Sequence, residues 1–81
     1  MTFGQAIEEM WKGNNVARHG WNGEGIFIAI QIPDEHSKMT GPYIYINTVG
    51  LVTDNVDAPK TIIPWLASQT DMLSKDWFIV T

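Results

Sequence analysis

The chain has 81 residues, of which nine are acidic and five basic, and its formal net charge is −4. This length fits a single small domain over residues 1–81, and the absence of cysteine excludes disulfides and thiolate metal sites. The acidic balance argues against DNA binding, because proteins that neutralise DNA phosphates carry the opposite charge.

The N-terminal residues have the pattern of an amphipathic helix. Thr2 can cap this helix, and Gln5 follows three residues later, as in a capping box. Gly13, followed by two asparagines, is a typical helix stop. Between these signals apolar side chains recur on one helical face, at Phe3, Ile7, Met10 and Trp11.

The rest of the chain has the pattern of short strands separated by turns, with one further helix. Residues 20–25 contain three glycines and predict a loop. Ser68 is the expected N-cap of a short helix, with Asp71 at its third position. The near-continuous apolarity of residues 26–32 predicts a strand covered on both faces. The expected extended segments are residues 16–19, 26–32, 43–46, 60–63 and 76–80, with residues 49–52 continuing the third of them after a kink.

These elements predict an α+β domain. We expect an N-terminal helix packed on a mainly antiparallel β-sheet, with a short helix before the last strand. A chain this small buries only ~60–65% of its unfolded surface. We therefore also expect a homo-oligomer, since assembly is a common support for small domains without disulfides.

Neither a membrane span nor a secretory signal is expected from this sequence. The longest apolar run, residues 26–30, has five residues, far below the ~18–20 of a membrane span. The first residues, Met-Thr-Phe-Gly-Gln, lack a basic region before an apolar core. We therefore expect a cytoplasmic protein that binds no membrane.

Catalytic and metal-binding patterns are weak. His19 and His36 each lack a second histidine or a cysteine at ligand spacing, so no metal site is expected. The sequence contains no nucleophile elbow, phosphate-binding glycine loop or dinucleotide fingerprint. Asp71 and Asp76 could form a carboxylate pair, but capping and solvation fit their spacing across a helix end better. We expect a protein that is not an enzyme and needs no cofactor.

Two segments combine aromatic and polar residues in an unusual way. Trp21 lies between Gly20 and Asn22 in the glycine-rich loop. It either folds back onto the sheet or forms a platform for a planar ligand, with Asn22 beside the ligand edge. Trp65 precedes four consecutive polar residues, 68–71, at a helix start whose free N–H groups suit phosphate oxygens. An ordinary capped helix with Trp65 in the core explains the same pattern.

The order and spacing of several segments resemble a known family. The segments are the opening Met-Thr-Phe-Gly-Gln-Ala, the Gly-Trp-Asn-Gly of residues 20–23, the Ser-Lys-Met-Thr of residues 37–40, the Pro-Tyr-Ile-Tyr-Ile of residues 42–46 and, most specifically, residues 64–73 with Asp76 and Trp77. Together they resemble the phage Thoeris anti-defence type 2 proteins, over nearly the whole chain. The resemblance implies a protein that sequesters, without cleaving it, the glycocyclic ADP-ribose signal made by bacterial TIR-domain immune enzymes. It also implies a homotetramer with ligand pockets at subunit interfaces and, in some members, a separate pocket for cyclic dinucleotides.

The leading hypothesis is therefore a homo-oligomer that binds a cyclic nucleotide. Trp21 would stack on the adenine, a contact worth ~1–3 kcal/mol per base, and Arg18 would be the phosphate cation. Asp71 would suit ribose hydroxyls, since a carboxylate beside a phosphate is repelled. Tyr43 shares a strand face with Tyr45, which is explained either by packing or by a hydroxyl at the pocket. The expected ligand-binding residues are Arg18, Trp21, Asn22, Tyr43, Trp65, Ser68, Gln69, Thr70 and Asp71.

Two other classes of function stay open. The aromatic residues could serve only core and oligomer contacts in a structural or protein-interaction domain, or the protein could cleave the nucleotide. Placement of Trp21 and Trp65 within the core of one chain would favour the first alternative, whereas placement on a cavity would favour ligand binding. Recovery of the intact ligand after denaturation would argue against cleavage.

Overall fold

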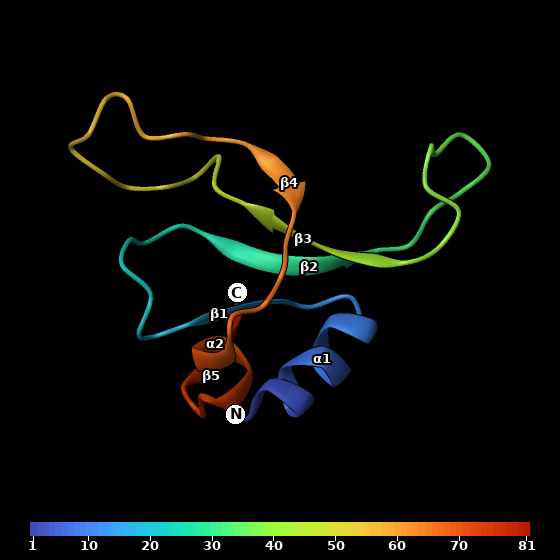
Figure 1. The fold of residues 1–81 in the computed structure, drawn as a ribbon, viewed down its shortest axis with the longest axis horizontal. Coiled ribbons are helices and arrows are strands. Elements are labelled where there is room, and N and C mark those ends of the chain that lie inside the picture. Colours follow the sequence, from blue (N-terminus) through green and yellow to red (C-terminus); the bar gives the residue numbers. More distant parts are fainter.

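One five-stranded antiparallel sheet and two helices make up the computed structural model, which describes residues 1–81 (Figure 1). The strands lie in the order β4-β3-β2-β1-β5, so the last strand pairs with the first. This arrangement confirms the predicted α+β class, including the short helix before the last strand. In chain order the elements are α1 (Phe3–Trp11), β1 (Asn15–Arg18), β2 (Phe27–Gln31), β3 (Tyr43–Asn47), β4 (Ile62–Pro64), α2 (Gln69–Leu73) and β5 (Trp77–Val80).

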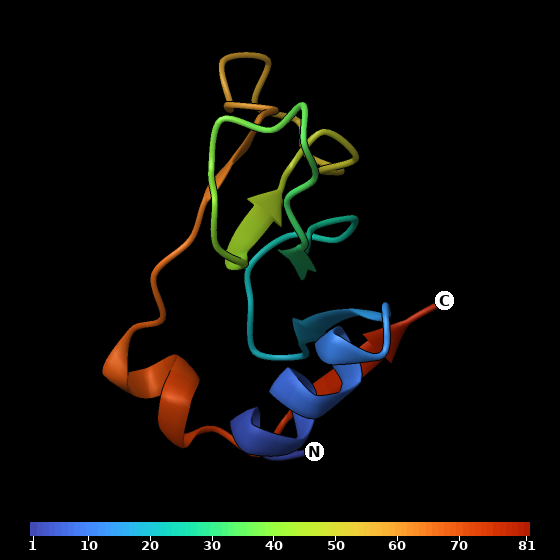
Figure 2. The same cartoon turned by 90° about the vertical axis from the view of Figure 1, so that its right-hand side faces the viewer.

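Helix α1 begins at the predicted capping box. The Thr2 hydroxyl accepts a hydrogen bond from the backbone N–H of Gln5 at 3.2 Å, and the Gln5 side chain accepts one from the backbone N–H of Thr2 at 2.9 Å. The helix then lies alongside β1 and β5 and buries Ala6 and Met10 against them (Figure 2). Trp11, which was expected on the same apolar face, is instead 57% exposed at the end of the helix. The resulting core cluster consists of Ala6, Met10, Val16, Ile28 and Trp77.

The two ends of the chain are tied together at β5. This strand pairs with β1 along its whole length, from Asn15 opposite Val80 to Arg18 opposite Trp77. The N-terminal ammonium of Met1 also donates a hydrogen bond to the carbonyl of Trp77, at 2.8 Å. The last strand therefore places Trp77 in the core beside the start of the chain.

The strand register divides the sheet into two faces. Val16, Ile28 and Trp77 lie on the face against which α1 packs. Ala17 and Phe78 are paired on the opposite face, because side chains alternate along a strand. Helix α2 also lies toward the first face, since the indole of Trp77 donates a hydrogen bond to its backbone. The second face is thus left without a covering helix.

Three local expectations need correction. Residues 49–52 do not continue β3; they turn, and Val52 forms an isolated bridge with Glu24. The fourth strand includes Pro64 instead of ending before it, which β4 tolerates because an edge strand leaves one side of its backbone unpaired. In β2 only Ile28 and Ala29 are buried, so the strand is not covered along its whole length. Neither α1 nor α2 has the length and hydrophobicity that a membrane-spanning helix requires.

Candidate functional site

Three tryptophans that are far apart in the sequence meet at one end of the sheet. The ring centroids of Trp21 and Trp77 are 5.3 Å apart, and those of Trp21 and Trp65 are 6.2 Å apart, both edge to face. Trp65 and Trp77 are also 6.2 Å apart, at 81°. This geometry is a favoured one for aromatic pairs. Trp77 is buried, whereas Trp21 and Trp65 are only partly buried and close the cluster from the outside.

Asp71, a residue of helix α2, connects this helix to the tryptophan cluster by hydrogen bonds. One carboxylate oxygen, Oδ1, accepts hydrogen bonds from Nη1 of Arg18 at 2.7 Å and from the indole Nε1 of Trp21 at 3.1 Å. The other, Oδ2, accepts hydrogen bonds from the hydroxyl and the backbone N–H of Ser68, at 2.8 and 3.1 Å. Burial acts to raise the pKa of Asp71, but the hydrogen bonds from Trp21, Arg18 and Ser68 outweigh it and lower the pKa to about 2. Asp71 is therefore ionised at neutral pH.

Arg18 is held between two carboxylates. Its Nε donates to Oδ1 of Asp76 at 2.8 Å, beside the contact of its Nη1 with Asp71. The backbone N–H of Gly20 donates to Oδ2 of Asp76 at 2.8 Å, so the same carboxylate also holds the start of the glycine-rich loop. The hydrogen bond from Arg18 lowers the pKa of Asp76, and the hydrogen bonds to Asp76 and Asp71 raise the pKa of Arg18. Only 11% of the Arg18 side chain is exposed, so its charge is directed into the protein.

The largest concavity lies at the loop between β1 and β2. It has a volume of about 710 Å³, within the usual ~300–1,000 Å³ of small-molecule sites. Gly25 shapes this loop: its φ is +86°, and a Cβ there would lie 2.0 Å from the carbonyl oxygen of Gly50. Only glycine allows that approach. The residues around the opening include Ala17, Arg18, His19, Trp21, Asn22 and Phe78.

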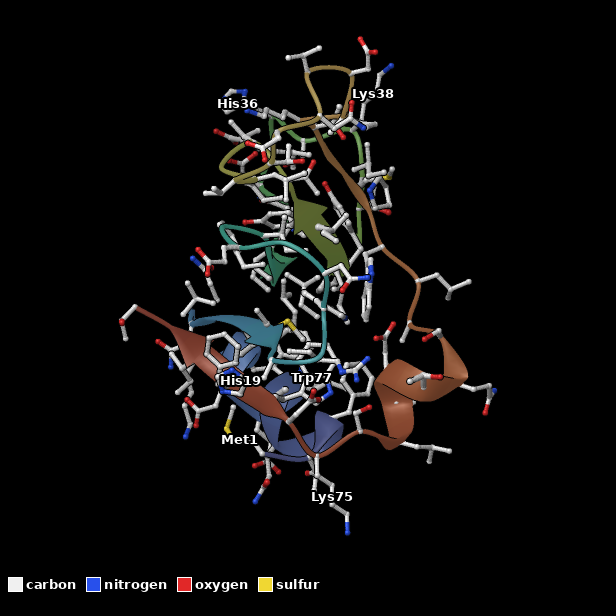
Figure 3. The ribbon with its side chains drawn as sticks, turned by 90° about the vertical axis from the view of Figure 1, so that its left-hand side faces the viewer. Met1, His19, His36, Lys38, Lys75 and Trp77 are labelled. Carbon is white, nitrogen blue, oxygen red and sulfur yellow. The ribbon has the colours of Figure 1, made fainter.

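A stacked aromatic pair stands in this concavity on the uncovered face of the sheet. The rings of His19 and Phe78 are nearly parallel, at 14°, with their centroids 4.1 Å apart. His19 is exposed and Phe78 is partly buried. Figure 3 shows His19 beside the last strand and His36 near the opposite end of the molecule. The two histidines therefore do not approach each other.

The structure brings most of the predicted ligand residues into one neighbourhood. Arg18, Trp21 and Asn22 line the concavity, and Trp65 and Asp71 join them through the tryptophan cluster and its hydrogen bonds. The remaining predicted residues lie outside this opening. Ser68, Gln69 and Thr70 are exposed at α2. Tyr43 begins β3 and lies opposite Gln31, the last residue of β2.

Neither His19 nor Phe78 is among the ligand-binding residues predicted from the sequence. The sequence suggests His19 as a metal ligand, which its spacing disfavours, or as a cation near the glycine-rich loop, and Phe78 only as part of the last strand. Alternation along residues 17–19 places Ala17 and His19 on one strand face, and this is the one sequence signal that points to His19 as part of the site. The partner strand and its register, which bring Phe78 to His19, have no such local signature.

Comparison with known proteins identifies the family. Residues 1–80 match the Thoeris anti-defense 2-like domain. The chain is also 35% identical, over 85 aligned residues, to the protein named Thoeris anti-defense 2 from Bacillus phage SP01. That alignment covers 100% of this chain and 96% of the phage protein. The chain therefore belongs to the Thoeris anti-defense 2 family.

Proposed function

We propose that this protein blocks Thoeris anti-phage defence by binding and sequestering glycocyclic ADP-ribose, and that it also accepts cyclic dinucleotides. The observation that carries the proposal is family membership over the whole chain. The concavity at the β1–β2 loop supports it, because an opening of about 710 Å³ can hold much of a nucleotide. The site of action would be the cytoplasm of the host bacterium, where the signal is made.

The proposed mode of action is capture without cleavage. Asp71, the most strongly perturbed acid beside the site, is ionised and shared among Arg18, Trp21 and Ser68. A carboxyl group with a pKa of about 2 is a poor proton donor and a weak base at neutral pH. Asp76 is likewise committed to Arg18. These acids suit a preformed binding site better than acid–base chemistry.

Binding would use both the loop and helix α2. Asn22, with Trp21 as a wall, would contact the ligand in the concavity of one protomer. Gln69 and Thr70 are exposed and lie outside this concavity, so they would contact ligand from a neighbouring protomer. A subunit interface at α2 is supported by the large apolar side chains around this helix, which are exposed in the single chain. These are Leu66 (91% exposed), Leu73 (77%) and Met72 (41%). We therefore propose a homotetramer.

Calorimetry and mass measurement test this proposal together. Glycocyclic ADP-ribose should bind tightly and linear ADP-ribose weakly, and the ligand recovered after denaturation should be chemically intact. Light scattering should give about four times the 9.1 kDa of one chain. Failure to bind glycocyclic ADP-ribose would contradict the proposed function, recovery of a cleaved product would contradict the capture mechanism, and the mass of a single chain would contradict the assembly.

A second candidate is a structural or protein-interaction domain. It is favoured by the packing of Trp21 against Trp65 and Trp77, which would give these aromatics a purely structural role. The calorimetric experiment separates the two candidates, because a domain of this second kind would bind neither glycocyclic ADP-ribose nor a cyclic dinucleotide.

A further inference from the structure

We propose that Asn22 is a site of spontaneous deamidation, and that its conversion to aspartate or isoaspartate reduces nucleotide capture with time. The chemical part of this inference depends only on the loop between β1 and β2, whereas its effect on binding rests on the proposed function. Asparagine is among the thermolabile residues of proteins. Asn22 is directly followed by Gly23, in the loop that Figure 1 shows joining β1 to β2.

Deamidation is a reaction between the side chain of Asn22 and the next peptide group. The backbone nitrogen of Gly23, after losing its proton to water or buffer, attacks Cγ of Asn22. A bond from Cγ to this nitrogen forms, the bond from Cγ to Nδ2 breaks, and ammonia leaves with a proton from the solvent. Water then opens the succinimide ring at either carbonyl and gives aspartate or isoaspartate. The net reaction consumes water and releases ammonia, so no oxidant or further reactant is required.

The fold restrains neither of the two reacting groups. Asn22 and Gly23 are both exposed, and neither the side-chain amide of Asn22 nor the backbone N–H of Gly23 makes a hydrogen bond within the chain. A glycine leaves this nitrogen open to attack, because no Cβ shields it. The backbone also favours glycine here, since φ of Gly23 is +113° and a Cβ would lie 2.7 Å from Cδ1 of Leu51. The shape of the loop therefore keeps a labile pair of residues in place.

Asn22 and Gly23 lie between two fixed points of the loop. On one side, the backbone N–H of Trp21 donates a hydrogen bond to the last carbonyl of β1, at 3.3 Å. On the other side, the carbonyl of Glu24 accepts one from the backbone N–H of Val52, at 2.9 Å. The two residues between these points make no backbone hydrogen bond, so they can rotate into the reactive geometry while the rest of the loop stays in place.

The other asparagines of the chain are better protected from this reaction. The amide of Asn14 donates a hydrogen bond to a carboxylate of α1 at 2.8 Å, and Asn15 lies within β1. The side-chain oxygens of Asn47 and Asn55 accept backbone hydrogen bonds at 2.9 and 3.0 Å. Asn15, Asn47 and Asn55 are also each followed by a β-branched residue, which crowds the attacking nitrogen. Asn22 should therefore react first, and the others provide internal standards.

Conversion of Asn22 would change the concavity in its charge and in its shape. The lining already contains Glu24, and its Arg18 is paired with two carboxylates. A further carboxylate would repel the phosphates of a nucleotide. Isoaspartate would also lengthen the main chain by a methylene carbon and displace Trp21 relative to Glu24. Both products should therefore capture nucleotide less well than the parent.

Peptide mass spectrometry of the intact protein after ageing tests the chemical step. In mildly alkaline buffer, the peptide that contains Asn22 should gain the mass difference between an amide and an acid severalfold faster than the peptides of the other asparagines. The reaction should be slower in mildly acidic buffer, because the backbone nitrogen must lose its proton. Asn22→Gln should stay unmodified at this position, since its larger ring closes more slowly. No conversion at Asn22, or equal rates at all asparagines, would overturn the inference.

Calorimetry with glycocyclic ADP-ribose tests the effect on binding. Asn22→Asp should bind on the order of 10-fold more weakly than the parent, and the aged parent should lose affinity in step with conversion at Asn22. The matched control is Asn22→Gln, aged in parallel, which should keep the affinity that it has when fresh. Fresh parent that does not bind would contradict the proposed function, while the peptide masses would still decide whether Asn22 is the modified residue. Equal affinities of the fresh parent and Asn22→Asp would overturn the effect on capture.

Discussion

Asp71→Asn tests whether the carboxylate of Asp71 organises the site. The substitution keeps the shape of the side chain and removes its charge. The pKa of Asp71 is held at about 2, against an ordinary value of 3.8. A depression of that size corresponds to ~2.5 kcal/mol of folding free energy at neutral pH. Only 13% of the side chain is exposed, so solvent screens this contribution little. We expect Asp71→Asn to lower the free energy of unfolding at pH 7 by ~2–3 kcal/mol.

The pH dependence identifies the charge as the cause. A carboxylate whose pKa is lowered by folding stabilises the protein fully above its ordinary pKa, and this stabilisation is lost as the pH falls through the folded value. About half of the contribution of Asp71 should be lost at pH 3, and most of it near pH 2. The difference between the parent and Asp71→Asn should shrink accordingly.

Urea denaturation followed by tryptophan fluorescence measures this difference, at one protein concentration because assembly adds to apparent stability. The control is Asp57→Asn, which makes the same charge change at an exposed loop residue and should cost no more than ~0.5 kcal/mol. The reasoning would be refuted if the two variants were equally stable at pH 7. It would also be refuted if the cost of Asp71→Asn were the same at pH 7 and pH 3.

Three further substitutions probe the surroundings of the site. Trp21→Ala should cost ~3–5 kcal/mol in urea denaturation, because the indole packs on two other indoles; a stable variant that has lost only nucleotide affinity would show that this residue is a ligand platform instead. Gly25→Ala should cost more than ~1 kcal/mol, since its φ is +86° and the new Cβ would meet Gly50. Thermal melting measures this loss of stability, and Gly41→Ala, where the added Cβ has open space, is the control. Ser68→Ala should cost ~0.5–2 kcal/mol through the lost cap, and calorimetry should find its affinity for glycocyclic ADP-ribose close to that of the parent.

Local signals in the sequence were sufficient for the helices and for most strands. The capping boxes of α1 and α2 involve residues three apart, Thr2 with Gln5 and Ser68 with Asp71, so short segments carry the whole pattern. The predicted end of β4 was wrong because a proline stops a strand only where its N–H is needed, and an edge position does not need it. Whether Pro64 lies at an edge depends on the order of all five strands.

The candidate site was predictable only in its parts. The sequence singled out the loop around Trp21 and the start of α2 as unusual, but it did not show that Trp21 donates a hydrogen bond to Asp71 across 50 positions. It suggested Arg18 as a free phosphate cation, whereas the fold pairs this side chain with two carboxylates.

The contacts between distant segments were decided by the tertiary structure. His19 stacks on Phe78, and Arg18 meets Asp76, only because β1 and β5 pair in one particular register. Backbone hydrogen bonds between strands are nearly the same for every residue type, so they do not by themselves select a partner or a register. That selection comes from burying one face of each strand against α1 and the tryptophan cluster, which is a property of the whole fold. The helix caps are therefore determined by short segments of the sequence. The site forms only when β1 and β5, which lie at opposite ends of the chain, pair with each other.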